Sequence, residues 1–308
     1  MLDLIDIISF LVGIVLLHYG SDLLVDNGSL LAKKYNISKL IIGMSLVAFG
    51  TSLPEFLVSM IAVFKGKIDL VTGNVVGSNI ANIGLVLGIS GFIYNISSDF
   101  KRIKIDIVFL IISTFSFLII LFLNEFGALS GFLLISILII YIYIIIQSDK
   151  IKDLSYEDSH INESFNKLLF FLFIGILALS IGSYSLIEGA ISIARYFNIS
   201  ELVIGATAIA LGTSLPELIT SLRAAKKNEF ELVLGNIFGS NIINIVLVFA
   251  TSLLMSGGVY NEKNFSLDIT VLSCLTILLI LTLSAGRIYR FVSVLFLSIY
   301  IYYIYIIL

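Results

Sequence analysis

The sequence predicts an all-α integral membrane protein with ten transmembrane helices, arranged as two inverted five-helix repeats. The chain is 59% hydrophobic and only 13% charged, whereas about a quarter of the residues in soluble domains are charged. Apolar stretches long enough to span a bilayer recur along its whole length. The hexapeptide GTSLPE occurs at 50–55 and again at 212–217, which indicates an internal duplication.

Each of the ten apolar stretches has the length of a membrane-spanning helix, which needs about 20 residues to cross a hydrocarbon core of about 30 Å. Runs such as LLISILIIYIYIII do not alternate polar with apolar residues, so strands of a membrane barrel are excluded. The spans are expected at roughly 5–32, 38–64, 68–94, 105–123, 128–147, 168–194, 201–223, 230–256, 266–284 and 288–307.

The 18 Lys and Arg residues predict the orientation. If the N-terminus lies outside, fourteen of them fall in the inner connections, and only Lys65, Lys67, Arg195 and Lys263 fall in the outer ones. This bias follows the positive-inside rule. We therefore expect both termini outside and the acidic 148–167 loop in the cytoplasm, as a short solvated linker.

The two halves of the chain match at a constant offset of 162 residues. YNISKLIIGMSLVAFGTSLPEFLVS at 35–59 aligns without a gap with FNISELVIGATAIALGTSLPELITS at 197–221. Because five helices per unit is an odd number, the second unit is expected to cross the membrane the opposite way up. Such inverted repeats are typical of secondary transporters, whose binding site lies at the repeat interface near the midplane. The expected units are 1–147, the linker 148–167, and 168–308, with the motif regions at 43–90 and 205–252.

The only two prolines, Pro54 and Pro216, lie inside the duplicated hexapeptide. Because proline has no N–H, each is expected to free the carbonyl of the glycine four residues earlier. A freed carbonyl at membrane depth is tolerated only where protein, water or an ion satisfies it. The residues beside each break offer oxygen atoms: Thr51, Ser52 and Glu55 in the first half, and Thr213, Ser214 and Glu217 in the second.

The two helices that carry the second motif, GNVVGSNIANI at 73–83 and GNIFGSNIINI at 235–245, are expected to form the opposite wall. Their glycines permit close packing, which is equally a general property of helix contacts in membranes. A four-residue spacing places oxygen atoms on one helix face, as for Thr51 with Glu55 and Ser78 with Asn82. The polar residues of this wall are Asn74, Ser78, Asn79, Asn82, Asn236, Ser240, Asn241 and Asn244.

Glu55 and Glu217 are the residues that packing alone explains least well. A charge at the middle of the membrane costs roughly 2.5–3.5 kcal/mol on insertion scales, and no basic residue lies beside either glutamate in its motif helix. Ca²⁺, and Na⁺ by the same reasoning, takes several oxygen ligands. The pair therefore indicates an exchangeable cation. Asp22, Asp26 and Glu188 lie toward helix ends and are expected to face water or to cap a turn.

At these motifs the chain resembles the cation/calcium exchanger superfamily, whose two repeats carry G-[ST]-S-x-P-E and G-N-x-x-G-S-N. It is most similar to the prokaryotic sodium/calcium exchangers, since proton/calcium exchangers typically carry a glutamate in the second motif that this sequence lacks. The resemblance implies an antiporter of the cytoplasmic membrane, not an enzyme, that exchanges Na⁺ for Ca²⁺ by alternating access to one central site. It implies no cofactor, no nucleic acid and no obligate protein partner; the partners are the two ions and the lipid bilayer.

The same resemblance implies the ion-binding positions. Many members carry an aspartate where this chain has Asn244, so potassium dependence is not implied. The implied ligands are Thr51, Ser52, Glu55, Ser78, Asn82, Thr213, Ser214, Glu217, Ser240 and Asn244, with the backbone carbonyls of Ala48 and Ala210.

Three other functions are weighed against this one. Proton-driven exchange is the closest rival. A cation channel needs a continuous pore, whereas a site between inverted repeats favours a transporter. An intramembrane enzyme is disfavoured because no serine–histidine arrangement or aspartate pair lies at matching depth.

Overall fold

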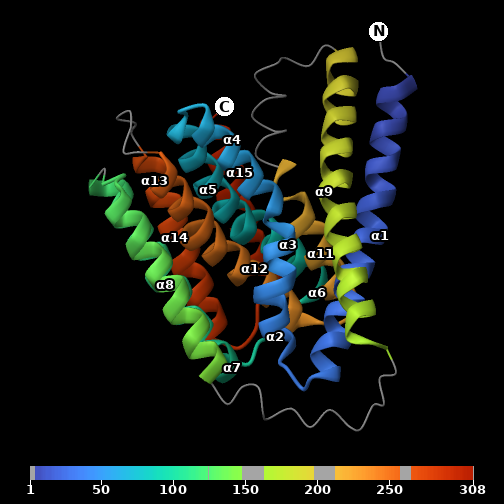
Figure 1. The fold of residues 1–308 in the computed structure, drawn as a ribbon, viewed down its shortest axis with the longest axis horizontal. Helices are drawn as coiled ribbons and strands as arrows, with labels where there is room; N and C mark the ends of the chain where they lie inside the picture. Colours follow the sequence, from blue (N-terminus) through green and yellow to red (C-terminus); the bar gives the residue numbers. More distant parts are fainter. Residues whose placement is uncertain (1–3, 124, 148–162, 198–211, 257–264, 308) are drawn as a thin grey trace.

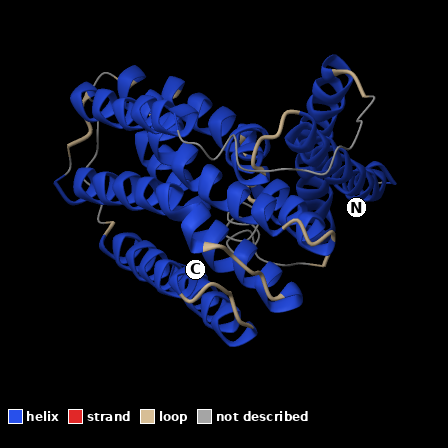
Figure 2. Ribbon diagram, turned by 90° about the horizontal axis from the view of Figure 1, so that it is seen from below, coloured by secondary structure: helices blue, strands red, loops and turns tan. Residues whose placement is uncertain are grey.

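The computed structural model describes residues 4–123, 125–147, 163–197, 212–256 and 265–307. In these segments the regular structure is helical, and one isolated β-bridge joins Ser97 to Arg287. Figure 2 shows the same arrangement, with helices joined by short loops. The all-α class expected from the sequence is therefore confirmed for the described part of the chain.

The helices follow the apolar stretches closely. Several membrane-length segments are built from two or three consecutive pieces, in which short π-helical turns (η) interrupt the α-helix. In chain order the elements are α1 Leu4–Lys34, α2 Lys39–Ile42, η1 Gly43–Val47, α3 Ala48–Thr51, α4 Leu53–Phe64, α5 Ile68–Ala81, η2 Asn82–Leu87, α6 Gly88–Tyr94, α7 Phe100–Leu123, α8 Ala128–Gln147, α9 Phe165–Tyr196, α11 Leu215–Lys226, α12 Phe230–Ile243, η4 Asn244–Phe249, α13 Ala250–Met255, α14 Ser266–Ser284 and α15 Arg290–Ile307.

Eight segments of the described chain are long and apolar enough to cross a membrane, and a ninth is the pair of Lys39–Thr51 and Leu53–Phe64, bent by 46°. Nine of the ten expected spans are thus accounted for. The remaining one, expected at 201–223, falls partly on residues outside the described segments, so a total of ten helices stays a prediction.

The motif helices form the centre of the molecule. In the most apolar stretch of Ile68–Tyr94, 72% of residues are buried, and in Phe230–Met255 the share is 89%. The corresponding share is 17% in α8 and 22% in α1. The two motif segments are therefore inside, and the outer helices expose apolar faces, as expected for a protein whose solvent is lipid.

Helices α1 and α9 lie side by side along one edge of the molecule (Figure 1). Their crossing leaves little or no room for side chains at five glycines, Gly13, Gly20, Gly175, Gly182 and Gly189. A Cβ atom on Gly13 would lie 2.5 Å from the backbone nitrogen of Leu186, and one on Gly189 would lie 2.7 Å from the carbonyl oxygen of Asp6. Gly20 and Gly182 are similarly restricted, with nearest atoms 3.0 and 2.9 Å away. The two backbones touch along nearly their whole length.

One end of the molecule gathers the connections that are rich in basic residues. We call it the linker end, and it contains Lys34, Lys39, Arg102, Gln147 and Glu163. Lys34 donates to the backbone carbonyl of Glu163 there. Figure 1 shows α1 beginning and α15 ending at the opposite end. The first described residues of α1 and the last described residues of α15 thus lie on the same side of the molecule.

A pair of tyrosine–aspartate contacts recurs at the 162-residue offset outside the motifs. The Tyr141 hydroxyl of α8 donates to Oδ1 of Asp106 in α7 at 3.3 Å. The Tyr303 hydroxyl of α15 donates to Oδ1 of Asp268 in α14 at 2.7 Å. The correspondence between the halves therefore extends to the last two helices of each unit, where the sequences themselves show little likeness.

Candidate functional site

Both duplicated hexapeptides break their helices. α3 ends at Thr51, and Ser52 leaves the helical region with φ −84° and ψ 6° before α4 begins at Leu53. Ser214 has nearly the same angles, −87° and 4°, before α11 begins at Leu215. The breaks expected from the prolines are confirmed. The argument that Thr51 and Glu55 share a face of one helix is wrong, because the helix is interrupted between them.

The carbonyls freed by the prolines have different surroundings. The carbonyl of Gly212 accepts a hydrogen bond of 2.7 Å from the Ser183 hydroxyl of α9, so protein satisfies it, as the proline argument requires. The repeat-related Ser21 of α1 instead donates to the carbonyl of His18 in its own helix. At Gly50 an added Cβ would lie 2.5 Å from the side chain of Ile176, so glycine lets α9 approach the first break.

Both glutamates are fully buried, but only one is held by hydrogen bonds. Glu55 and Glu217 are each 0% exposed. Oε1 of Glu217 accepts from the hydroxyl of Ser52 at 3.2 Å and from that of Ser240 at 3.3 Å. Neither carboxylate oxygen of Glu55 has a hydrogen-bond partner in the described part of the chain. The second glutamate is therefore anchored across the interface by the first repeat.

Two asparagines fasten the turns that carry the glutamates. Nδ2 of Asn74 donates to the backbone carbonyl of Glu55 at 3.1 Å and to the Ser59 hydroxyl at 3.0 Å. Asn236 makes the equivalent bonds, of 3.4 and 3.0 Å, to the carbonyl of Glu217 and to Ser221. Sequence reasoning counted both asparagines only as polar wall residues. The serine four positions after each glutamate, present in both copies, was the signal for this contact.

Hydroxyl groups from the two halves meet in matched pairs. Ser78 and Thr213 lie 3.4 Å apart, as do Ser240 and Thr51. Each pair joins the GNxxGSN helix of one repeat to the broken helix of the other. These four predicted ligands are therefore brought to the interface between the repeats.

Asn82 and Asn244, which are related by the repeat and are both predicted ligands, have different surroundings. Each begins a π-helical turn, a distortion that is frequent at functional sites. Nδ2 of Asn82 donates to Oδ1 of Asn241 at 3.0 Å. Neither side-chain polar atom of Asn244 has a hydrogen-bond partner within the described residues, although this residue is fully buried.

Three further hydrogen bonds between the repeats, all donated by the first repeat, are one-sided. Ser52 reaches Glu217 and Asn82 reaches Asn241, and Thr51 donates to Oδ1 of Asn236 at 3.0 Å. In the described part of the chain no hydrogen bond joins the repeat-related pairs. Those pairs are Ser214 with Glu55, Asn244 with Asn79, and Thr213 with Asn74.

A group of buried oxygen atoms at this interface has no protein partner among the described residues. Buried polar atoms in native proteins nearly always have a partner, so a concentration of such atoms points to a ligand. The atoms are Oε1 and Oε2 of Glu55, Oε2 of Glu217, Oγ of Ser214, Oδ1 of Asn82 and Oδ1 of Asn244. All six belong to residues that the sequence predicts as ligands.

The two alanine carbonyls stand apart from this group. The carbonyl of Ala48 accepts from the backbone N–H of Ser52 at 2.9 Å and lies 3.3 Å from the Thr51 hydroxyl, so at least one of its lone pairs is in use in this conformation. Ala210 lies outside the described residues.

No salt bridge involves either glutamate in the described segments. The charged partners lie instead toward the linker end, where Asp22 pairs with Arg223 and Lys227, and Asp26 with Lys227. Asp26 faces water, as predicted, with 54% of its side chain exposed, whereas Asp22 is only 21% exposed. Both also tie α1 to α11 and its C-terminal loop, contacts that the sequence did not predict. Burial lowers the pKa of Lys227, but its bonds to Asp26 and Asp22 outweigh this effect and raise it above the ordinary value.

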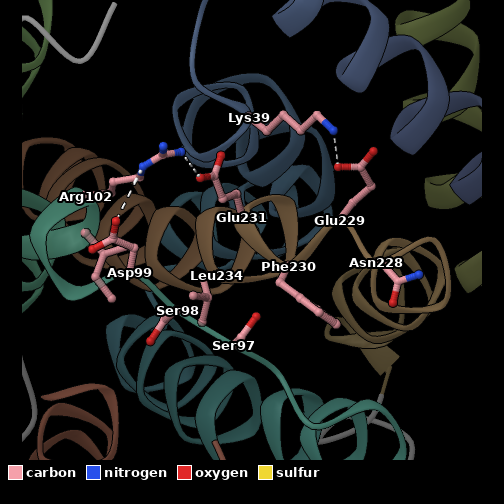
Figure 3. Close-up of a pocket in the computed structure, with 11 residues that line it drawn as sticks. Lys39, Ser97, Ser98, Asp99, Arg102, Asn228, Glu229, Phe230, Glu231 and Leu234 are labelled. Atoms are coloured by element: carbon pink, nitrogen blue, oxygen red, sulfur yellow. Dashed lines mark hydrogen bonds and ion pairs between the residues drawn. The ribbon is translucent and has the colours of Figure 1, made fainter. Parts of the chain in front are cut away.

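A recess of about 500 Å³ opens at the linker end, lined by Lys39, Asp99, Arg102, Glu229 and Glu231 among others (Figure 3). Lys39 pairs with Glu229, and Arg102 pairs with Glu231 at 2.9 Å. The recess contains none of the predicted ligands. Glu231 precedes Ser240 by nine residues, about 13 Å along the axis of α12, so the two features are distinct.

The sequence matches the family described as sodium/calcium exchanger protein over residues 5–147 and 167–308. It is 38% identical to an uncharacterized membrane protein of Methanocaldococcus jannaschii over 293 residues, which cover 95% of this chain and 94% of that one. It is 29% identical to the sodium/calcium exchanger MaX1 of Methanosarcina acetivorans, with 92% of each chain covered.

The fold also matches a solved structure. The sodium-calcium exchanger NCX_Mj superposes with a TM-score of 0.83 at 36% identity, with 97% of each chain covered. The similarity spans both halves and therefore includes both copies of the site motifs.

Proposed function

Because this chain belongs to the sodium/calcium exchanger protein family, a family of transporters and not of enzymes, we propose that it is a Na⁺/Ca²⁺ antiporter of the cytoplasmic membrane. Cation/calcium exchange and a multi-pass membrane location follow from the family and from the apolar helices. The proposal adds the coupling ion, the membrane and the mechanism. Inward flow of sodium would drive calcium out of the cell.

One observation carries the proposal: two fully buried glutamates without a basic partner share an interface with oxygen atoms that lack hydrogen bonds. Ca²⁺ takes six to eight oxygen ligands, carboxylates and amide carbonyls among them. Two carboxylates would balance one Ca²⁺ or two Na⁺. The two ions would therefore compete for the same oxygens instead of binding together, which is the requirement for exchange.

The proposed ligands are those predicted from the sequence. Glu55 and Glu217 supply the charge, while hydroxyl and amide oxygens complete the shell. The set is Thr51, Ser52, Glu55, Ser78, Asn82, Thr213, Ser214, Glu217, Ser240 and Asn244, with the carbonyls of Ala48 and Ala210. The Ala48 carbonyl already accepts from the backbone N–H of Ser52, so it would offer a cation its remaining lone pair.

The proposed mechanism is alternating access between two inverted repeats, 1–147 and 168–308, joined by the 148–167 linker. The tyrosine–aspartate contacts and the asparagine contacts behind the glutamates support this division, because each recurs at the 162-residue offset. We propose that the linker end is cytoplasmic and that both termini are outside, in agreement with the positive-inside rule.

Proton-driven exchange is the competing proposal. Glutamates can carry protons as well as bind cations, so the two carboxylates alone do not exclude it. Sodium is favoured because the oxygens that lack partners include neutral hydroxyl and amide groups, which add ligands for a metal cation but do not take up protons at neutral pH.

The test is calcium flux in proteoliposomes that contain the purified protein. A sodium gradient should drive calcium uptake, and a pH gradient of equal size without sodium should not. Uptake driven by the pH gradient alone would contradict the proposal of sodium coupling. Single-channel currents in a planar bilayer would contradict the proposal of an antiporter.

A further inference from the structure

The side chain of Asn236 links the two broken helices. It is 0% exposed and lies in the middle of α12. Its Nδ2 reaches back to the turn of Glu217, at the backbone carbonyl and Ser221, while its Oδ1 faces Thr51 of the other repeat at 3.0 Å. One planar amide therefore connects the second glutamate turn to a hydroxyl of the first motif.

The direction of these hydrogen bonds follows from chemistry. The carbonyl of Glu217 can only accept, so the amide edge that faces it must be the NH₂ group, and the carbonyl oxygen of the amide must face Thr51. That oxygen also only accepts, which makes the Thr51 hydroxyl the donor. The single proton of this hydroxyl is thus held by Asn236, and the lone pairs of the hydroxyl oxygen take no part in this bond.

The state of this proton matters for a cation ligand. A hydroxyl binds a metal cation through its lone pairs, and a partner that holds the proton keeps those lone pairs available. Without Asn236, the Thr51 proton would turn to the Ala48 carbonyl at 3.3 Å or to Ser240 at 3.4 Å. Residues that orient ligands in this way typically change metal affinity by about 10–100-fold when removed.

We propose that Asn236 is a positioning residue: it holds the proton of the Thr51 hydroxyl across the repeat interface and so sets this hydroxyl to bind the transported cation. The proposal rests on the proposed function in taking Thr51 as a ligand. Asn74 makes the same contacts to the turn of Glu55 and to Ser59, and no matching hydrogen bond to Thr213 is formed among the described residues. This role therefore belongs to Asn236 in the conformation seen here.

The test is a double-mutant cycle on equilibrium binding of radioactive ⁴⁵Ca²⁺ by the purified full-length protein in sodium-free buffer. Asn236→Ala is measured in the wild-type, Thr51→Ser and Thr51→Val backgrounds. The Kd for Ca²⁺ should rise about tenfold in the first two, which keep the hydroxyl. It should change less than about twofold in Thr51→Val, which has no proton to hold. Equal changes in all three backgrounds would overturn the proposal.

Two further variants complete the design. Thr72→Val removes a buried hydroxyl of α5 that bonds only to the carbonyl of Ile68 in its own helix, and it should leave the Kd unchanged. If Asn236→Ala does not fold, Ser221→Ala removes one of the two acceptors that fix the amide. It should raise the Kd about threefold in the wild type and not in Thr51→Val, and an equal rise in both would overturn the proposal.

Failure of the proposed function is distinguishable from failure of this inference. A wild-type protein that binds ⁴⁵Ca²⁺ but shows no sodium-driven flux would refute the exchange function. The double-mutant cycle on Ca²⁺ binding could still be interpreted. Wild-type protein that binds no Ca²⁺ in sodium-free buffer would refute both.

Discussion

At the scale of single residues, the two glutamates have the same sequence context and unequal surroundings. Glu217 is held by Ser52 and Ser240, whereas the carboxylate of Glu55 accepts no hydrogen bond within the described residues. A carboxylate without hydrogen bonds in a buried place is poorly stabilised unless a cation compensates it. In the proposed site, Glu55 therefore depends on the ion more than Glu217 does.

We expect Glu55→Gln and Glu217→Gln each to reduce sodium-driven calcium uptake to background. A single carboxylate leaves a dehydrated divalent ion half neutralised in a site of low dielectric constant, where charge interactions are strong. Both proteins should still insert, because loss of a buried charge lowers the cost of insertion. The measurement is calcium flux in proteoliposomes at matched protein content.

Glu231→Gln is the matched control for this pair. It removes a carboxylate that is partly exposed and pairs with Arg102 in the linker-end recess, and it should retain most of the flux. Near-normal flux in either site variant would contradict a shared two-carboxylate site.

Sequence reasoning predicted the residues that meet at the interface between the repeats but could not assign their hydrogen-bond partners. The motifs are nearly identical in both halves, so no pattern within them can predict that Ser52 bonds to a glutamate while Ser214 does not. The contact of Asn236 with Ser221 was missed for a different reason. The two residues lie on different helices, and only the packing of α11 against α12 brings them together.

At the scale of elements, α1 is fastened to the rest of the molecule near the linker end by charge. Asp22 and Asp26 pair with Arg223 and Lys227, and the Ser29 hydroxyl donates to Oε1 of Glu229 at 2.9 Å. The positions related to Asp22 and Arg223 by the repeat are Tyr184 and Ile61, which cannot form an ion pair. We define the ion pairs of Asp22, Asp26, Arg223 and Lys227 as the clamp. Its Asp22–Arg223 pair has no repeat-related counterpart, whereas Asp26 and Lys227 correspond to Glu188 and Lys65, which carry the same charges.

Reversal of one charge in this clamp should destabilise the protein. Asp22→Arg places a third positive charge beside Arg223 and Lys227, and we expect the Tm to fall by on the order of a few degrees. Adding Arg223→Asp should restore most of the loss, since opposite charges would face each other again. Thermal unfolding of the purified variants measures both effects.

The control for the clamp is Glu163→Arg, which reverses one charge of an exposed i,i+4 pair with Lys167. Exposed pairs contribute about 0–1 kcal/mol, so its Tm should stay close to that of the wild type. A double variant no more stable than Asp22→Arg alone would show that these residues do not act through their charges.

The crossing of α1 and α9 should be sensitive to added bulk. A Cβ on Gly182 would lie 2.9 Å from the backbone nitrogen of Leu17, so Gly182→Leu forces the two helices apart. The resemblance to the exchanger superfamily implies that this pair moves against the motif helices during exchange, and we therefore expect the rate of calcium uptake to fall more than calcium affinity does. The two quantities are the maximal flux and the ⁴⁵Ca²⁺ Kd.

Gly127→Leu serves as the comparison, since nothing lies within 4 Å of its Cβ position. It should leave both quantities unchanged. Weakened binding with normal turnover in Gly182→Leu would show that these glycines serve the site and not the motion.

The positions of the helices were largely predictable, because hydrophobic length fixes a membrane span. The expected span 68–94 coincides with Ile68–Tyr94, and 266–284 with Ser266–Ser284. The π-helical turns at Asn82 and Asn244 were not predictable. They depend on which backbone carbonyl each N–H reaches, and composition does not encode this choice.

At the scale of the whole molecule, the proposed orientation can be tested by chemical labelling. A cysteine at Ser155, in a Cys274→Ser background, should resist membrane-impermeant thiol reagents applied to intact cells, because the 148–167 linker is expected in the cytoplasm. The exposed native Cys274 must be removed first. Lys65→Cys, at the end of the molecule opposite the linker end, should react. Rapid labelling at 155 together with protection at 65 would invert the topology.

The one-sided hydrogen bonds between the repeats have a thermodynamic consequence. In the proposed cycle the repeats exchange roles, so Ser52 would leave Glu217 as Ser214 approaches Glu55, and Asn82 would leave Asn241 as Asn244 approaches Asn79. Each bond broken has a counterpart of the same chemistry, and at this interface the two end states would have nearly equal free energy. The Asp22–Arg223 pair of the clamp has no such counterpart, so it would favour one end state. The binding site of such a carrier favours neither end state, so the ion concentrations on the two sides of the membrane decide which way calcium moves.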